Sequence, residues 1–169
     1  QDAYTIESLR RAQAAIASGA FDGEVVPVTI KTRKGDVTIS IDEAPGKGQP
    51  DKIPLLKPAF AQDGTITAAS SSSISDGAAA VVLSRASTAA EKGLAPVATI
   101  VGVSAHAQEP AKFTTAPGGA ITKLLKNIDW QIDQVDLFEI NEAFACVAMF
   151  AMHDLGIAHE KINVHGGAT

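Results

Sequence analysis

Two polar residues, Asn141 and Glu142, interrupt an otherwise apolar stretch that reads DLFEINEAFA from residue 136 to residue 145. They stand between a strand-like run and a helix-like run, and this position allows two roles. Asn is a favoured helix N-cap, and Glu142 would interact well with the helix dipole. The carboxyl end of a strand beside a helix N-terminus is also where α/β sheets bind ligands, and an amide there can donate to a developing oxyanion. The local sequence leaves both roles open.

Four consecutive serines at 70–73 form a second candidate. A serine run can be a flexible linker or a helix cap. This run is short, however, and leads through Asp76-Gly77 into the apolar segment 78–84. Its hydroxyls and backbone amides therefore precede structured chain, where they could bind a small ligand, and the linker and ligand-binding alternatives both stay open.

The only cysteine, Cys146, lies in an apolar helix-like segment without a neighbouring cation that would favour the thiolate. This context favours a buried structural residue over a nucleophile. The four histidines are scattered, and no pair has the HExxH spacing of a zinc site. A P-loop and a GxGxxG motif are also absent from the sequence. We therefore expect no metal site, and we assign no histidine a catalytic role.

The elements that position these residues begin with an amphipathic helix over 3–18, which Gly19 ends. The β-rich runs 24–32 and 36–42 predict a hairpin. Residues 43–58 contain four prolines and two glycines, which predicts an extended surface segment.

Strand-like and helix-like segments alternate from residue 78 onward. Segment 97–107 is almost continuously apolar, as expected of a strand covered on both faces. The alternation over 97–167 predicts βαβ units around a covered sheet, and the fold class is therefore α/β. Strands are expected at 78–84, 97–107, 134–140 and 161–167, and helices at 86–94, 118–128 and 142–156.

Composition narrows the function classes. The chain has 169 residues, is 46% hydrophobic and carries a net charge of −5, which argues against a nucleic-acid-binding protein. Its longest apolar runs are shorter than the roughly 20 residues of a membrane span, and no signal-peptide core is present. A cytoplasmic protein is the expectation. The sequence starts inside a helical pattern without Met and ends on Gly-Gly-Ala-Thr, so we expect a piece of a longer chain.

Four segments together resemble the thiolase family and, more narrowly, acetyl-CoA C-acetyltransferases. The Asn-Glu-Ala-Phe motif in the third segment is the most specific of them. The resemblance implies a layered α-β-α-β-α core of two similar halves, with a loop domain inserted in the first half. The four segments are residues 1–28, 56–83, 139–145 and 162–168.

The resemblance also implies acyl transfer: condensation of two acetyl-CoA molecules to acetoacetyl-CoA, or the reverse thiolysis of a 3-ketoacyl-CoA. Coenzyme A thioesters are the substrates, and no metal or redox cofactor is needed. In thiolases the asparagine of the motif holds a water in an oxyanion hole, a role that falls here to Asn141. Such a donor would stabilise the transition state by about 3 kcal/mol.

Other positions match residues that contact the pantetheine arm of coenzyme A in thiolases. Two serines depart from the family pattern, since Ser70 and Ser75 stand where asparagines are usual. The residues that match the pantetheine-contacting positions of thiolases are Ser72, Ala68, Ala59, Phe60 and Phe144.

The two catalytic cysteines and the Gly-His-Pro histidine of thiolases have no counterpart in residues 1–169, and Cys146 matches neither cysteine. We therefore predict that this chain alone is inactive. By resemblance, residues 1–74 are the second part of the loop domain, 75–93 the end of the first core half, and 94–169 the start of the second. The full enzyme is expected to be a homodimer or homotetramer.

Two alternatives stay open: a non-catalytic thiolase-like protein that binds acyl-CoA, and a thiolase for longer 3-ketoacyl-CoA chains. A ketoacyl synthase of the same superfamily is disfavoured, because synthases have a histidine near the position of NEAFA.

Overall fold

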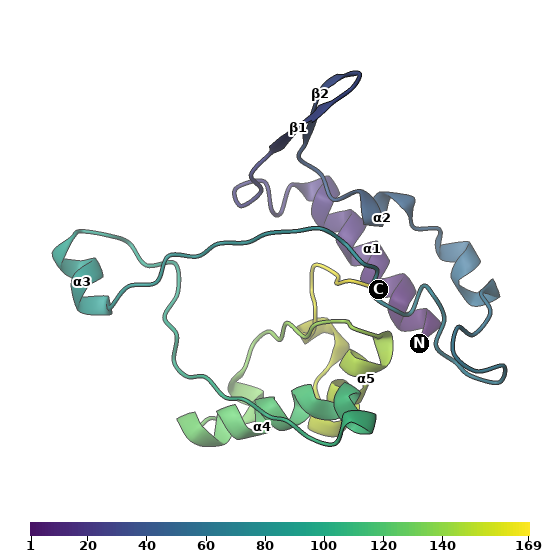
Figure 1. Ribbon diagram of the computed structural model, residues 1–169. Coiled ribbons are helices and arrows are strands. Elements are labelled where there is room, and N and C mark those ends of the chain that lie inside the picture. The colour runs from purple at the N-terminus through teal and green to yellow at the C-terminus, as the bar shows by residue number, and fades with distance from the viewer.

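The computed structural model describes residues 1–169. Its longest helix, α1 (Asp2–Ser18), begins one residue before the predicted helix 3–18 and ends at the predicted residue (Figure 1). The helix ends at Gly19, whose φ of 67° lies in the left-handed region that glycine adopts without strain. There Ala20 donates its N–H to the Ala15 carbonyl at 3.0 Å.

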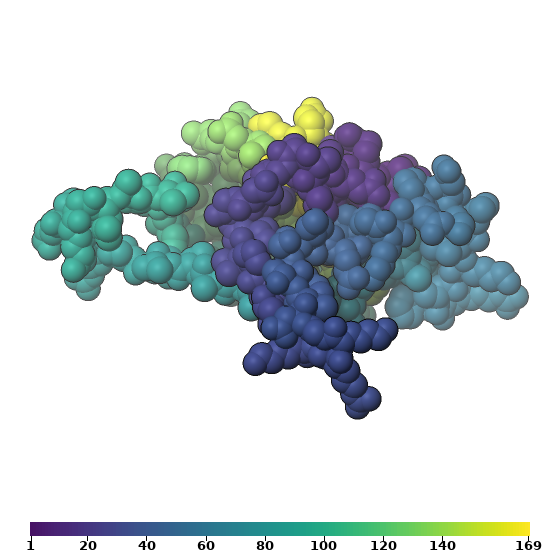
Figure 2. All heavy atoms as spheres, turned by 90° about the horizontal axis from the view of Figure 1, so that it is seen from above, coloured from purple at the N-terminus to yellow at the C-terminus, as the bar shows by residue number.

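The expected hairpin is present but shorter. Strands β1 (Val28–Thr32) and β2 (Gly35–Ile39) pair antiparallel, with Val28 opposite Ile39 and Ile30 opposite Val37. All ten strand residues are exposed, and the hairpin projects from the rest of the molecule (Figures 1 and 2). It forms the only sheet in residues 1–169.

The prediction of an extended segment over 43–58 is wrong, because two short helices form there. Helix α2 (Glu43–Lys47) starts where the Asp42 side chain accepts a hydrogen bond from the Ala44 N–H at 3.0 Å. The 3₁₀-helix η1 (Pro50–Leu55) has proline at its first position. Proline is compatible with the first turn of a helix because the N–H it lacks would have no partner there.

The strands expected at 78–84 and 97–107 do not form. Both segments are extended, and Val81, Val82 and Val97 are 83%, 97% and 102% exposed. A strand exists only where a neighbouring strand takes up its backbone hydrogen bonds, and no strand of residues 1–169 pairs with these segments. Helix α3 (Ala86–Glu91) lies between the two segments and confirms the helix predicted over 86–94. It is far from the other helices, because the extended segments on either side of it project from the rest of the molecule (Figure 1).

Helix α4 (Ala116–Ile128) confirms the helix predicted over 118–128. Segment 97–107 lies along this helix. The Ser104 hydroxyl donates to the Ala120 carbonyl at 2.7 Å, and the Lys123 ammonium donates to the Ala105 carbonyl at 3.0 Å. The 3₁₀-helix η2 (Pro110–Thr115) leads into α4, and η3 (Ile132–Gln134) follows it.

Helix α5 (Ala145–Leu155) begins three residues later than expected and is followed by η4 (His159–Lys161). The strands expected at 134–140 and 161–167 are reduced to one parallel bridge between Phe138 and Ile162. There the Phe138 N–H donates to the Lys161 carbonyl at 2.8 Å, and the Asn163 N–H donates to the Phe138 carbonyl at 2.9 Å. The chain thus makes a minimal βαβ unit around α5.

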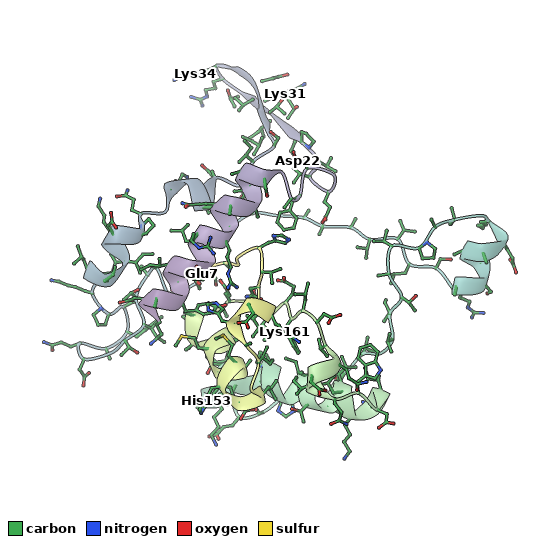
Figure 3. All side chains as sticks on the ribbon, turned by 180° about the vertical axis from the view of Figure 1, so that it is seen from behind. Glu7, Asp22, Lys31, Lys34, His153 and Lys161 are labelled. Atoms are coloured by element: carbon green, nitrogen blue, oxygen red, sulfur yellow. The ribbon has the colours of Figure 1, made fainter.

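The core lies between α5, this bridge and α1. Small residues of α5 are fully buried, so neighbouring backbone can approach the helix closely. Arg11 ties α1 to the C-terminal part by donating to the carbonyls of His159 and Ile162, at 3.1 and 2.7 Å. Glu7 and Lys161 mark these two parts in Figure 3. The core residues are Tyr4, Phe138, Ile140, Ala145, Val147, Ala148, Ala151, Ile157 and Ile162.

None of the helices has the length and apolar character needed to cross a lipid bilayer.

Candidate functional site

Asn141 is exposed and lines a cavity of about 350 Å³. Of the two roles that the sequence allowed for Asn141, the helix cap is not observed. Helix α5 starts at Ala145, with Phe144 in the N-cap position and no side-chain cap. Asn141 precedes this cap by three residues, so its amide is not used by the helix terminus.

The cavity lies where the start of α4, the loop before it and the start of α5 meet. Apart from Asn141 and His106, its walls are apolar. A hydrogen-bond donor in such surroundings interacts more strongly with developing charge than it would in water. The lining residues are His106, Phe113, Ala116, Pro117, Ala120, Asn141, Ala143 and Val147.

Three phenylalanines form an aromatic row beside the cavity: Phe60, Phe144 and Phe113. The ring centroids of Phe60 and Phe144 are 6.1 Å apart with a 78° interplanar angle. Those of Phe113 and Phe144 are also 6.1 Å apart, at 62°. These edge-to-face contacts connect the loop that carries Phe60 to the cavity wall at Phe113.

The serine run is ordered and is not a free linker. Ser72 donates from both its N–H and its hydroxyl to the Ala143 carbonyl, at 3.2 and 3.3 Å. Ser71 forms an antiparallel bridge with Phe144, and the Ala145 N–H donates to the Ser70 carbonyl at 2.9 Å. Ser72 is itself exposed, so a ligand can reach it.

Ala59 and Ala68 lie on the exposed loop that carries Phe60, which is closed by a 2.8 Å hydrogen bond from the Ala59 N–H to the Ile66 carbonyl. The structure thus joins this loop, the serine run and the Asn141 segment at Phe144 and Ala143. All the site residues predicted from the sequence belong to these three segments.

The sequence suggested that Glu142 interacts with a helix dipole, but the structure gives it a different role. Its side chain is buried, with 1% of the residue exposed, and it accepts hydrogen bonds from distant parts of the chain. Its Oε1 accepts hydrogen bonds from the Tyr4 hydroxyl at 2.6 Å and the Asn163 amide at 2.8 Å. Its Oε2 accepts from the Ser8 hydroxyl at 2.7 Å. Thr169 adds two donors to Oε2, its N–H at 3.1 Å and its hydroxyl at 2.9 Å. These residues form the Glu142 network: Glu142, Tyr4, Ser8, Asn163 and Thr169.

Protonation in this network follows from burial and hydrogen bonding. Burial raises the pKa of Glu142, but the hydrogen bonds from Tyr4, Asn163, Ser8 and Thr169 outweigh it, so the pKa is lower than usual. Burial, followed by the bond to Glu142, raises the pKa of Tyr4. Glu142 is therefore the ionised acceptor and Tyr4 the protonated donor.

Sequence reasoning missed several of these residues. His106 lies near the end of segment 97–107, which the sequence predicted as a strand, and Phe113 lies in η2. No local signal at either position indicates that its side chain lines the cavity. The His106 ring fits against α4 because Gly119 has no side chain: a Cβ at Gly119 would lie 2.7 Å from the ring. A weak signal was available for Tyr4 and Ser8, whose hydroxyls lie one helical turn apart on the same face of α1.

Cys146 is half-buried on α5 and does not line the cavity. Residues 1–169 contain no cluster of three or more His, Cys, Asp or Glu side chains that could bind a metal ion. A larger cavity of about 520 Å³ lies between α1, residues 42–56, residues 69–75 and residues 167–169. Ser73 of the serine run lines it, whereas Asn141 and the residues matched to coenzyme A contacts do not.

Comparisons with known proteins agree on one family. Residues 1–87 match the family described as "Thiolase, N-terminal domain", and residues 94–169 match "Thiolase, C-terminal domain". A probable acetyl-CoA acetyltransferase from Dictyostelium discoideum is 48% identical over 100% of this chain and 41% of its own length.

Solved structures give the same result. The acetyl-CoA acetyltransferase of Bacillus anthracis is 42% identical, with a TM-score of 0.96 over 99% of this chain and 43% of its own. The Acat5 thiolase of Ascaris suum, solved in complex with coenzyme A, is 41% identical, with a TM-score of 0.92 over 99% and 43%. The chain thus spans less than half the length of these relatives.

Proposed function

The chain belongs to the thiolase family and has the thiolase fold over 99% of its length, and from this premise we propose that the protein containing it transfers acyl groups between coenzyme A thioesters. The proposed reaction joins the enolate carbon of one acetyl-CoA to the acyl carbon of another, with release of free CoA. Thiolysis of acetoacetyl-CoA is the reverse. The exposed Asn141 amide in a mostly apolar cavity is the observation that carries the proposal.

In this proposal Asn141 stabilises the negative charge that develops on the thioester oxygen when the enolate forms, through the water that the family resemblance implies. The mostly apolar walls offer few dipoles that compete with the Asn141 amide, and a bound substrate would cover this exposed side chain and keep solvent from the developing charge. Asn141 has no role as a helix cap, so its amide is available to do so.

The pantetheine arm of the substrate is proposed to follow the aromatic row toward the cavity, beside Ser72 and the loop 59–68. The three segments that meet at Ala143 and Phe144 support this path. The Ascaris suum relative, solved with coenzyme A, supports the ligand class. The proposal includes no resident metal or redox cofactor.

Cys146 is not proposed as the nucleophile, because it does not line the cavity. The acyl-accepting thiol is proposed to come from outside residues 1–169, so the chain alone is predicted to be inactive. We also propose a homodimer or homotetramer, which light scattering after gel filtration would test. The cytoplasmic location stays a prediction from the sequence.

The experiment that tests the function uses the complete protein, extended to the length of its relatives. Purified protein is mixed with acetoacetyl-CoA and free CoA, and acetyl-CoA formation is followed by chromatography, with the 169-residue chain as the comparison. We expect turnover by the complete protein only. Binding of coenzyme A without turnover would instead favour a non-catalytic acyl-CoA-binding protein. A marked preference for longer 3-ketoacyl-CoA substrates would favour a thiolase for longer chains.

A further inference from the structure

We propose that Glu142 is a positioning residue for Asn141: its buried carboxylate fixes the backbone on which the Asn141 amide is presented to the cavity. The inference rests on the proposed function of Asn141 as the oxyanion donor. Glu142 itself does not line the cavity, so it would act only through its neighbour.

The backbone before Asn141 is held by Asn163. The Asn163 amide oxygen accepts the Ile140 N–H at 2.8 Å, and its nitrogen donates to the Ile140 carbonyl at 2.8 Å. Both polar backbone groups of Ile140 are therefore satisfied by one side chain. That side chain is oriented by Glu142 Oε1, which accepts from the same amide nitrogen at 2.8 Å.

The backbone after Asn141 is held by Glu142 and by the serine run. The Glu142 carboxylate is fixed by its own donors, and the Ala143 carbonyl accepts two hydrogen bonds from Ser72. Asn141 thus lies between residues that are hydrogen-bonded on both sides. An amide that must be in place before charge develops gains from such fixation, since a misplacement of about 1 Å can cost about 100-fold in rate.

The chemistry of the network requires a carboxylate at residue 142. Two oxygens accept five hydrogen bonds from neutral donors, and no lysine or arginine forms an ion pair with them. Glutamine has one acceptor oxygen in place of two, and its NH₂ group would face donors of the network. Through Tyr4 and Ser8 the same carboxylate connects α1 to the Asn141 segment.

Glu142 could instead be a purely structural anchor, and a double-mutant cycle separates the two roles. In the complete protein, Glu142→Gln is made alone, Asn141→Ala alone, and both together, with Glu139→Gln as the matched control at an exposed position. Rates of acetoacetyl-CoA thiolysis and thermal unfolding are measured for all of them. If Glu142 acts through Asn141, its loss costs little once Asn141 is gone.

We expect Glu142→Gln to lower kcat by about 10- to 100-fold, with KM within about 3-fold of the wild-type value. In the Asn141→Ala background the same change should lower kcat by less than about 3-fold. Equal losses in the two backgrounds would overturn the positioning role. Tyr4→Phe removes the 2.6 Å hydrogen bond to Glu142 Oε1, together with the longer 3.4 Å bond that the Tyr4 hydroxyl accepts from the Asn163 amide. It serves in the same cycle if Glu142→Gln does not fold.

Absence of thiolysis by the wild-type complete protein would contradict the proposed function but not this inference. In that case, crystal structures of the wild-type protein and the Tyr4→Phe variant test whether the Glu142 network positions the Asn141 amide. A displaced or disordered Asn141 amide in the variant supports the positioning role, and an unmoved amide overturns it.

Discussion

Asn141 and Glu142 are neighbours in sequence but have opposite environments. Asn141 is exposed and lines the 350 Å³ cavity, whereas Glu142 is 1% exposed and accepts hydrogen bonds from both ends of the chain. Tyr4 and Thr169 meet on its carboxylate although they are far apart in the sequence. One residue of this pair is therefore available to a ligand, and the other connects it to the core.

Removal of the Asn141 amide tests the proposed oxyanion donor directly. In the complete protein, Asn141→Ala should lower kcat for thiolysis by about 100- to 1,000-fold, because a donor to developing charge is lost. The melting temperature should change little, since Asn141 is exposed and caps no helix. Asn127→Ala on the exposed face of α4 is the matched control. A variant with undiminished kcat would contradict the role of Asn141.

Gly167 lies so close to Glu142 that an added Cβ would overlap the carboxylate. Gly167→Ala should therefore displace Glu142 and lower the free energy of unfolding by about 1–3 kcal/mol, the usual cost of overpacking. Urea denaturation measures this. Gly23→Ala, where a Cβ meets nothing within 4 Å, should change the value by less than about 0.5 kcal/mol. Equal effects of the two substitutions would show that the contact with Glu142 is unimportant.

Stability should fall as the pH is lowered. The folded pKa of Glu142 lies below its ordinary value of 4.5, and hydrogen bonding to Arg10, with Arg11, lowers the pKa of Glu7 to about 2. The unfolded state then binds more protons than the folded state. This contribution is fully present above pH 4.5 and is lost as the pH falls through the folded pKa values.

Urea unfolding measured from about pH 7 to about pH 3 checks this dependence. The Glu142→Gln variant cannot titrate at this position, so its unfolding free energy should depend less steeply on pH than that of the wild-type protein. Glu139→Gln, at an exposed position, should keep the wild-type slope. Identical slopes for all three proteins would show that Glu142 does not contribute to the acid dependence.

Phe60 is 73% exposed, although its ring contacts Phe144. Such an exposed ring beside the cavity is expected if a bound ligand covers it. Phe60→Ala in the complete protein should weaken coenzyme A binding by about 2- to 13-fold, since an aromatic contact contributes about 0.5–1.5 kcal/mol. Calorimetric titration with coenzyme A measures the change. Phe21→Ala removes a partly exposed ring that contacts His165, away from the site, and should leave the affinity unchanged. An unaltered affinity in Phe60→Ala would place the pantetheine path elsewhere.

Local patterns in the sequence were sufficient for the elements whose hydrogen bonds are local. Helix α1 with its Gly19 end, the hairpin, α3 and α4 all follow from periodicity and turn residues. The motif at Asn141 and the run ending at Ser72 also identified segments that the structure brings together. These predictions succeeded because helices and hairpins pair residues that are close in the chain.

Only the tertiary structure decided the rest. The apolar runs 78–84 and 97–107 have the composition of strands but no neighbouring strand within residues 1–169, and a strand cannot form without a strand partner for its backbone. Whether Asn141 caps a helix depended on where α5 begins, and the buried role of Glu142 depended on Tyr4, Ser8 and Asn163 reaching it from distant positions. The sequence determined which polar residues were present, and long-range packing determined that the amide lines the cavity and the carboxylate is buried.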